Sequence, residues 1–184
     1  KNGVREFTPV ARVSDMLLKP GAPCEYNGAH MTYPDIKLVY WPGGNPFHHH
    51  QDLNRLRKAF ARVDTLVVHD LAWTASARHA DFVLPCTMSL EREDIGSSQT
   101  DPMMVAMHQM AEPFGDARDD YAIFTGLSER LGAADAFTEG RTPREWLKHL
   151  YQPTYDGLKA KGLDAPDFDA FWATTLAEAD RFPL

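Results

Sequence analysis

The chain has 184 residues, 43% of them hydrophobic and 24% charged, and its formal net charge is −7. This composition is typical of a globular protein, and the length suits one large domain or a domain with an appendage. The negative charge and the absence of a basic stripe argue against nucleic acid as a partner, and no apolar run is long enough to cross a bilayer. The cysteines, Cys24 and Cys86, are too few for a disulfide framework and lack metal-ligand spacing.

The N-terminal stretch, residues 1–34, is rich in proline and glycine. We expect it to be a connecting arm from a preceding domain, with one short helix at Val10–Leu18 that ends before Pro20 and the rest formed by loop or hairpin. The chain begins at Lys1 without a basic and apolar leader segment, which we interpret as a piece of a longer protein.

From residue 35 the pattern becomes regular. Strands are predicted at Ile36–Trp41, Thr65–His69 and Asp81–Leu84, and helices at Asp52–Arg62 and Thr74–His79. The middle strand is a continuous apolar run rich in β-branched residues, which is typical of a parallel sheet covered by helices. The sequence therefore predicts an α/β fold: a Rossmann-like open parallel sheet with helices on both faces, connected by right-handed crossovers.

The same domain is predicted to run from 35 to 184, with extra helices at its C-terminal end. Cys86–Pro102 is polar and is expected to be irregular, whereas Met103–Met110 is apolar and fits a strand better than a buried helix. Three helices are then predicted from their Asp or Thr caps, at Asp119–Leu131 (capped by Asp119 or Asp120), from Thr142 onward, and at about Asp167–Ala179.

Polar side chains follow each predicted strand. Parallel strands deliver their following loops to one edge of the sheet, so the loops Gly43–His50, His69–Trp73 and Pro85–Asp94 should line one crevice. A few polar groups on a rigid scaffold are what a small-molecule site needs. The side chains expected there are Asn45, His49, His69, Asp70, Arg92 and Asp94.

These residues also have purely structural interpretations. Gly43-Gly44 fits a tight turn, and no glycine fingerprint for a dinucleotide or triphosphate is present. Asp70 fits a turn or helix cap as well as a carboxylate that accepts two parallel hydrogen bonds from a guanine. Arg92 fits a surface ion pair as well as a bidentate pyrophosphate contact. For His48–His50 a hydrogen bond to a ligand oxygen is favoured over a metal site, because adjacent side chains point in different directions.

Three stretches resemble a known family: YWPGGNPFHHHQDLNRL (40–56), VVHDLAWTASARHADFVLPCTMSLEREDI (67–95) and ARDDYAIFTGLSERLG (117–132). They are similar to molybdopterin oxidoreductases of the dimethyl sulfoxide reductase family, and most similar to the dimethyl sulfoxide, trimethylamine N-oxide and biotin sulfoxide reductases. The resemblance implies a piece of a larger four-domain enzyme that holds a bis(molybdopterin guanine dinucleotide) molybdenum centre. The cofactor-binding residues that it implies are Gly44, Asn45, His49, His69, Asp70, Arg92 and Asp120.

The resemblance also implies a function for the parent enzyme. We expect it to reduce a small S-oxide or N-oxide by oxygen-atom transfer at molybdenum, in the periplasm or the cytoplasm of a bacterium. The metal ligand is expected outside this chain, so the segment itself should supply cofactor binding and no catalytic or metal-ligating residue. Its expected partners are the cofactor, the remaining domains of the parent chain and the oxide, with no membrane span. The alternatives are a stand-alone α/β module that binds a guanine nucleotide or a protein partner, and a small histidine-rich metal protein.

Overall fold

The computed structural model describes residues 7–98 and 101–173. The chain divides into two compact units, Lys1–Cys86 and Thr87–Leu184. Each unit has its own cluster of buried apolar side chains. The division predicted from the sequence, an arm over 1–34 and a domain over 35–184, stays a prediction.

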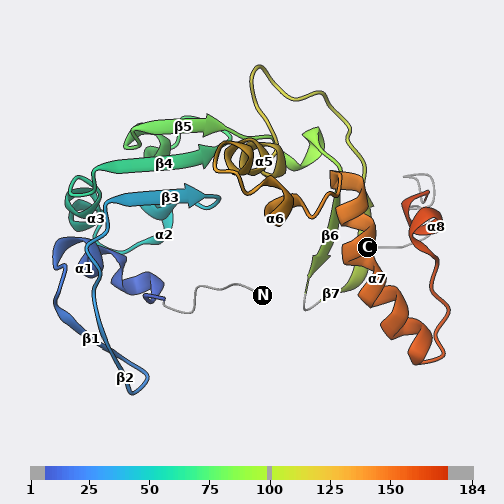
Figure 1. Cartoon of the computed structure of the whole chain (residues 1–184), viewed down its shortest axis with the longest axis horizontal. Coiled ribbons are helices and arrows are strands. Elements are labelled where there is room, and N and C mark those ends of the chain that lie inside the picture. The colour runs from blue at the N-terminus through green and yellow to red at the C-terminus, as the bar shows by residue number, and fades with distance from the viewer. Residues whose placement is uncertain (1–6, 99–100, 174–184) are drawn as a thin grey trace. The chain divides into compact units, whose positions relative to one another are not determined.

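The first unit is built on a three-stranded parallel sheet whose spatial order, β3-β4-β5, is also its order in the chain. Figure 1 shows the three arrows pointing the same way. The strands are β3 (Leu38–Pro42), β4 (Thr65–Asp70) and β5 (Phe82–Pro85). All three predicted strands are therefore confirmed, each within two residues of its expected bounds.

The predicted helices of this unit are also present. They are η1 (Val10–Arg12) with α1 (Val13–Leu18), α3 (Leu53–Phe60) and α4 (Ala75–Arg78). One helix was not predicted: α2 (Pro46–His49), a single turn in the loop after β3. The stretch expected to be loop or hairpin contains an antiparallel hairpin of β1 (Pro23–Tyr26) and β2 (Ala29–Thr32).

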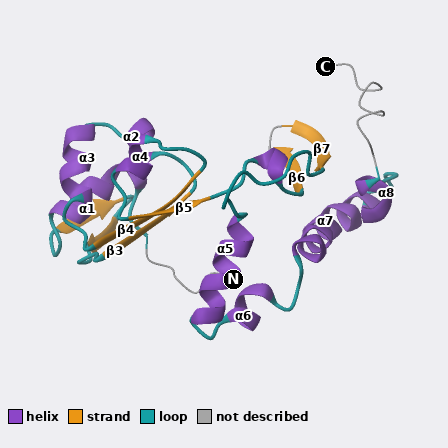
Figure 2. Ribbon diagram, turned by 90° about the horizontal axis from the view of Figure 1, so that it is seen from above, coloured by secondary structure: helices purple, strands orange, loops and turns teal. Residues whose placement is uncertain are grey.

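The crossover helices cover one face of this sheet. Because the strand order does not reverse, two right-handed crossovers must place α3 and α4 on the same side. Figure 2 shows α2, α3 and α4 together on that side. The predicted α/β class is confirmed: the open parallel sheet is flanked by helices, and further helices follow toward the C-terminal end.

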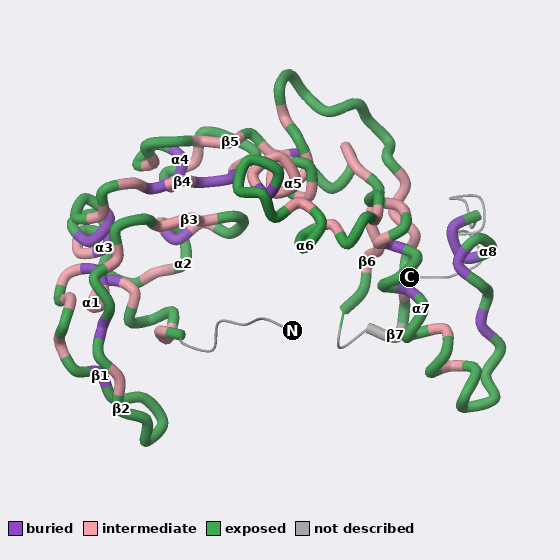
Figure 3. Tube along the Cα trace, viewed as in Figure 1, coloured by how far each residue is buried: buried purple, intermediate pink, exposed green. Residues whose placement is uncertain are grey.

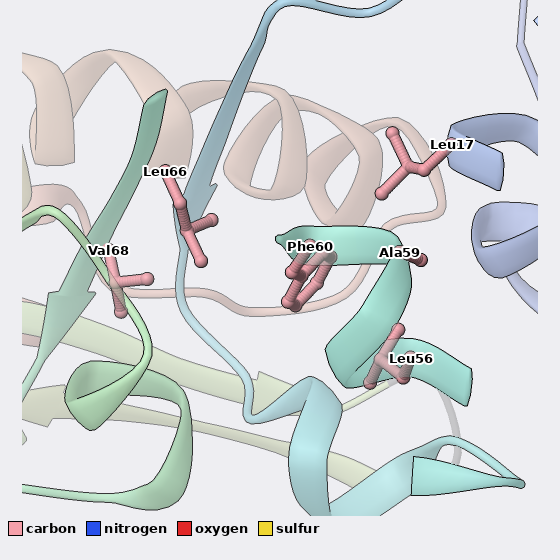
Figure 4. Packing of buried hydrophobic residues seen from close by; sticks show 6 residues of the cluster. All are labelled: Leu17, Leu56, Ala59, Phe60, Leu66 and Val68. Carbon is pink, nitrogen blue, oxygen red and sulfur yellow. The ribbon is translucent and has the colours of Figure 1, made fainter. Parts of the chain in front are cut away.

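The core of the first unit lies between α3 and the sheet. Leu56, Ala59 and Phe60 recur at helical spacing on α3, and alternate residues of β4, Leu66 and Val68, point toward them (Figure 4). All five are at most 5% exposed. Burial of each large aliphatic or aromatic side chain contributes about 1.5–3 kcal/mol. Figure 3 shows that buried positions of this unit concentrate in α3 and β4.

Helix α1 contacts α3 through an ion pair as well as through apolar packing. Leu17 joins the core of α3, and the Arg55 guanidinium donates a hydrogen bond to the Asp15 carboxylate. Arg12 and Lys19 also approach this carboxylate, at 3.5 and 3.7 Å. The hydrogen bond from Arg55 holds the pKa of Asp15 below its ordinary value. The segment expected as an arm therefore packs on the first unit through α1.

The second unit combines an antiparallel hairpin with helices. Its elements are η2 (Ser89–Glu91), β6 (Asp94–Ser98), β7 (Asp101–Met107), α5 (Asp120–Arg130), α6 (Ala134–Thr138), α7 (Pro143–Ala160) and α8 (Phe168–Trp172). The strand predicted at Met103–Met110 is confirmed by β7. The irregular structure predicted over Cys86–Pro102 is wrong for β6, because pairing with β7 overrides the weak strand propensity of its Gly and Ser residues.

The helix starts of the second unit follow the predicted caps. Asp119, rather than Asp120, caps α5 by accepting a hydrogen bond from the backbone N–H of Ala122 at 2.7 Å. Thr142 and Glu145 form the predicted capping box of α7. The last predicted helix is present as α8, and residues 174–179 of that prediction lie outside the described residues. The helix α6 was not predicted.

Aromatic packing forms the core of the second unit. Tyr151 of α7 stacks on Phe171 of α8 with ring centroids 4.6 Å apart, and Phe168 stacks on Trp172 at 5.6 Å. The Arg144 guanidinium lies 4.2 Å from the Trp172 ring centre. In the part of the chain that the structure describes, no helix is both long and apolar enough to cross a membrane.

Candidate functional site

The carboxyl ends of β3, β4 and β5 lie side by side in the first unit. Pro42 at the end of β3 is opposite His69, and Asp70 at the end of β4 is opposite Pro85. The residue Asn45 follows β3 by a short turn, so it belongs to the same edge. The structure therefore brings Asn45, His69 and Asp70 together at the edge where open α/β sheets bind ligands.

The turn after β3 places a carboxamide at this edge. Gly43 and Gly44 have φ of +80° and +72°, a backbone conformation that glycine adopts without strain, so the predicted tight turn is present. Asn45 follows at the N-cap position of α2, but its side chain does not cap that helix. Instead, its Oδ1 accepts a hydrogen bond from the hydroxyl of Ser76, which is 1% exposed. The exposed His49 stands at the end of α2.

His69 is a buried ring at the end of β4. It is 2% exposed, and its Nε2 shares a hydrogen bond of 2.7 Å with the hydroxyl of Tyr40 on β3. The two rings meet edge to face, with centroids 5.3 Å apart. Tyr40 therefore fixes the orientation of the imidazole through one of its two ring nitrogens.

The Asp70 carboxylate takes part in the local turn, as its structural interpretation requires. Its Oδ1 accepts a hydrogen bond from the backbone N–H of Leu71 at 2.8 Å, and its Oδ2 accepts one from the hydroxyl of Thr74. The Thr74 hydroxyl also caps α4 by accepting from Ala77 N–H. A carboxylate oxygen has two acceptor directions, so these two bonds leave each oxygen capacity for a second one. The guanine interpretation of Asp70 is thus chemically compatible with the turn.

Arg92 and Asp120 lie in the second unit. Both line a cavity of about 690 Å³. The Arg92 guanidinium donates to Asp94 Oδ2 at 3.1 and 3.2 Å and to the carbonyl of Thr87 at 3.1 Å. The predicted ion pair of Arg92 therefore exists, and its partner is Asp94. Its neighbour Glu91 accepts from backbone N–H groups instead.

The cavity walls come from the η2 segment and from the starts of α5 and α7. Asp120 stands in the first turn of α5, next to the capping Asp119. Thr87 is 4% exposed, and among the described residues neither its hydroxyl nor the indole N–H of Trp146 has a hydrogen-bond partner. Buried polar groups in native proteins nearly always have partners. Both residues line the cavity, but these two atoms are themselves buried behind its wall.

Comparison with known proteins places the chain in a family. Residues 18–130, more than half of the 184, match the family model of molybdopterin oxidoreductases. The chain belongs to the molybdopterin oxidoreductase family. The resemblance carried by the three stretches is thereby confirmed.

Several relatives within this family are close in sequence. Biotin sulfoxide reductase of Cereibacter sphaeroides is 49% identical over 171 residues, which are 92% of this chain and 23% of that protein. Dimethyl sulfoxide/trimethylamine N-oxide reductase of Rhodobacter capsulatus is 48% identical over 96% of this chain and 21% of its own length. Trimethylamine-N-oxide reductase of Haemophilus influenzae is 47% identical over 90% and 20%. The chain thus spans about a fifth of these relatives.

A solved structure is also similar. Acetylene hydratase from Pelobacter acetylenicus superposes with a TM-score of 0.50 and 28% sequence identity, over 56% of this chain and 14% of that one. The two chains therefore share the fold of that part of the backbone.

Sequence analysis of this molybdopterin oxidoreductase segment did not single out Ser76, Thr74, Tyr40 or Thr87. The N-cap pattern of Thr74 was visible, but nothing in the sequence linked its hydroxyl to Asp70. Within 7–98 and 101–173, no three His, Cys, Asp or Glu side chains group as metal ligands; His48 and His49 merely pack ring to ring, at 5.2 Å.

Proposed function

We propose that this chain is the segment of a molybdenum-dependent S-oxide or N-oxide reductase that binds molybdopterin guanine dinucleotide. The observation that carries the proposal is the meeting of Asn45, His69 and Asp70 at the carboxyl edge of a parallel sheet. The close relatives are named for sulfoxides and an amine N-oxide. Because the chain spans about a fifth of them, the activity is proposed for the whole enzyme, together with its remaining domains.

The polar groups of the first unit fit a guanine nucleotide. Guanine presents two adjacent donors, N1–H and the exocyclic amine, and a carboxylate with one remaining acceptor direction on each oxygen matches both. Asp70 is such a carboxylate, since each of its oxygens accepts one local hydrogen bond. Asn45 offers an amide NH2 to an acceptor atom, and the left-handed turn at Gly44 lets the backbone approach closely.

The cavity of the second unit fits a polar part of a cofactor of this kind. Arg92 lines this cavity, and we assign its guanidinium to the binding of phosphate oxygens. A guanidinium is planar and can donate two parallel hydrogen bonds to a phosphate. Asp120 supplies an acceptor at the start of α5. We assign Arg92 and Asp120 to cofactor contacts on this basis, and we assign the exposed His49 to them because it lies in the loop that also carries Asn45.

In the proposed enzyme, a bis(molybdopterin guanine dinucleotide) molybdenum centre supplies the oxygen-atom transfer when bound. The residues of this chain bind and orient the nucleotide end of that cofactor. We assign none of them to the reacting atoms, so the segment by itself should have no reductase activity.

The decisive test replaces Asp70 by Asn in the full-length enzyme. Asp70→Asn keeps an oxygen for Leu71 N–H and a polar partner for Thr74, but it turns one acceptor toward guanine into a donor. Charged hydrogen bonds contribute about 1.5–3 kcal/mol, so retention of the cofactor should fall roughly 10- to 100-fold. Molybdenum and guanine nucleotide released per polypeptide are the measurements.

The matched control is Asp64→Asn, an exposed aspartate just before the opposite end of the same strand β4. It should retain both molybdenum and nucleotide. Undiminished molybdenum and guanine content in Asp70→Asn would overturn the guanine role of Asp70. A wild-type enzyme without either component would overturn the proposed function itself.

A further inference from the structure

The buried hydroxyl of Ser76 contacts one of the candidate cofactor residues from a different element. Ser76 lies on α4, its Oγ donates to Asn45 Oδ1, and the two residues are 31 positions apart. Only 1% of Ser76 is exposed, so water does not compete for this bond. A buried hydroxyl needs such a partner, and here the partner is a side chain rather than the backbone of its own helix.

The side chain of Asn45 is diverted from the role that its position favours. Asn at an N-cap normally accepts a hydrogen bond from a backbone N–H of the first helical turn. At α2 no such bond is made, although Asn45 occupies the N-cap position. The carboxamide oxygen faces Ser76 instead, so α4 and not α2 determines how the amide group is turned.

This arrangement selects which half of the amide remains for a ligand. A carboxamide has an acceptor oxygen and two N–H donors, and rotation by half a turn exchanges them. With the oxygen held by Ser76, the NH2 group is left without a partner among the described residues and offers donors only. A ligand atom at this place must then be an acceptor, such as a phosphate, hydroxyl or purine carbonyl oxygen.

We propose that Ser76 is a positioning residue that presents the Asn45 NH2 group to an acceptor atom of the cofactor. This inference rests on the proposed function. The buried bond keeps the amide in one of its two orientations before the cofactor arrives, so that no reorientation is needed on binding. Ser76 itself does not touch the cofactor.

The experiment uses the full-length enzyme with Ser76→Ala, Asn45→Ala and the double variant. One net hydrogen bond and the lost orientation should lower cofactor retention roughly 3- to 10-fold in Ser76→Ala. Retention is measured as guanine nucleotide and molybdenum that remain per polypeptide after a timed wash, and the thermal midpoint of the cofactor-free protein is measured in parallel. In the Asn45→Ala background the Ser76 substitution should cause no further loss, because Ser76 acts through Asn45.

Two further variants sharpen the result. Ser128→Ala is the matched control, since Ser128 is also a buried helical serine, 8% exposed, whose hydroxyl bonds, within the described part of the chain, only to the Thr125 carbonyl of its own helix. It should leave retention unchanged. Asn45→Asp keeps an acceptor for Ser76 but removes the NH2 donors, so it should lose as much cofactor as Asn45→Ala.

Each contrary outcome has a distinct meaning. If Asn45→Ala loses cofactor while Ser76→Ala behaves like Ser128→Ala, the positioning role is overturned and the proposed function stands. Equal loss on Ser76→Ala with and without Asn45 would overturn it as well, since Ser76 would then act through stability. Full retention in Asn45→Asp would overturn the donor assignment. Full retention in Asn45→Ala would remove Asn45 from the proposed site.

Discussion

The two units hold their candidate residues in different ways. In the first unit, each polar group at the sheet edge meets a hydroxyl from another position: Asn45 with Ser76, His69 with Tyr40, and Asp70 with Thr74. In the second unit, Arg92 is held by the charge of Asp94 and by a backbone carbonyl. A neutral hydroxyl orients its partner without changing the charge of that partner. An ion pair orients the two side chains and also neutralises their charges.

Because of this difference, substitutions in the first unit should weaken cofactor binding without a large loss of stability, whereas substitutions in the second unit should lower both. A hydroxyl partner of a ligand-binding group can be removed at little cost to the fold, because the strand ends are fixed by backbone pairing. The Arg92 network joins η2 to the start of β6, so its removal should affect the fold and the cofactor together. Loss of core packing beneath the sheet edge should lower both the stability of the fold and cofactor binding more than either of these changes.

The largest effect is expected from Phe60→Ala. Phe60 is 5% exposed and packs with Trp41 and Phe47, at centroid distances of 6.0 and 5.7 Å. Truncation of a buried Phe leaves a cavity and should lower the free energy of unfolding by about 3–5 kcal/mol. Urea unfolding of the full-length protein measures this. The control Leu53→Ala, on the same helix but 43% exposed, should change it by less than about 0.5 kcal/mol. Equal effects of the two would contradict the core assigned to α3.

An intermediate effect is expected from Arg92→Ala. Hydrogen bonds to charged groups contribute about 1.5–3 kcal/mol, and this substitution removes three donors to Asp94 and Thr87. The unfolding midpoint and the cofactor content should both fall. Arg92→Lys should lower the midpoint and the cofactor content less than Arg92→Ala does, but it should not restore them fully, because an ammonium lacks the planar donor arrangement of a guanidinium. Arg130→Ala, which loses one bond to a helix carbonyl at an exposed position, is the control. An unfolding midpoint equal to that of the wild type in Arg92→Ala would contradict the expectation that stability and cofactor binding are coupled in the second unit.

The smallest effect is expected from Asp15 and depends on pH. The pKa of Asp15 is lowered in the folded protein, chiefly by the hydrogen bond from Arg55. Its ion pair therefore stabilises the fold above the unfolded pKa near 3.9, and this contribution is lost as the pH falls through the folded pKa. At pH 6, Asp15→Asn should lower stability by up to about 1 kcal/mol, since the pair is partly exposed. The difference between variant and wild type should vanish toward pH 2 in thermal unfolding. A difference that persists at pH 2 would show that packing, not charge, joins α1 to α3.

Elements whose signals are local were predictable from the sequence. The apolar run of Thr65–His69 and the caps at Asp119 and Thr142 predicted the main strand and helix positions. The hairpin strand β6 was missed because it exists through pairing with β7. Similarly, α2 is a single turn, too short for any periodicity to show.

The α/β class, the parallel strands and the family could be predicted from the sequence, because hydrophobic period, helix caps and motif residues are properties of neighbouring positions. The edge that gathers Asn45, His69 and Asp70 was also predictable, since parallel strands share a direction. The placement of both crossover helices on one face and the hydrogen bond by which Ser76 orients the amide of Asn45 are visible in the folded structure alone. Strand order and a hydrogen bond across 31 positions depend on how distant segments pack, and no local pattern encodes them.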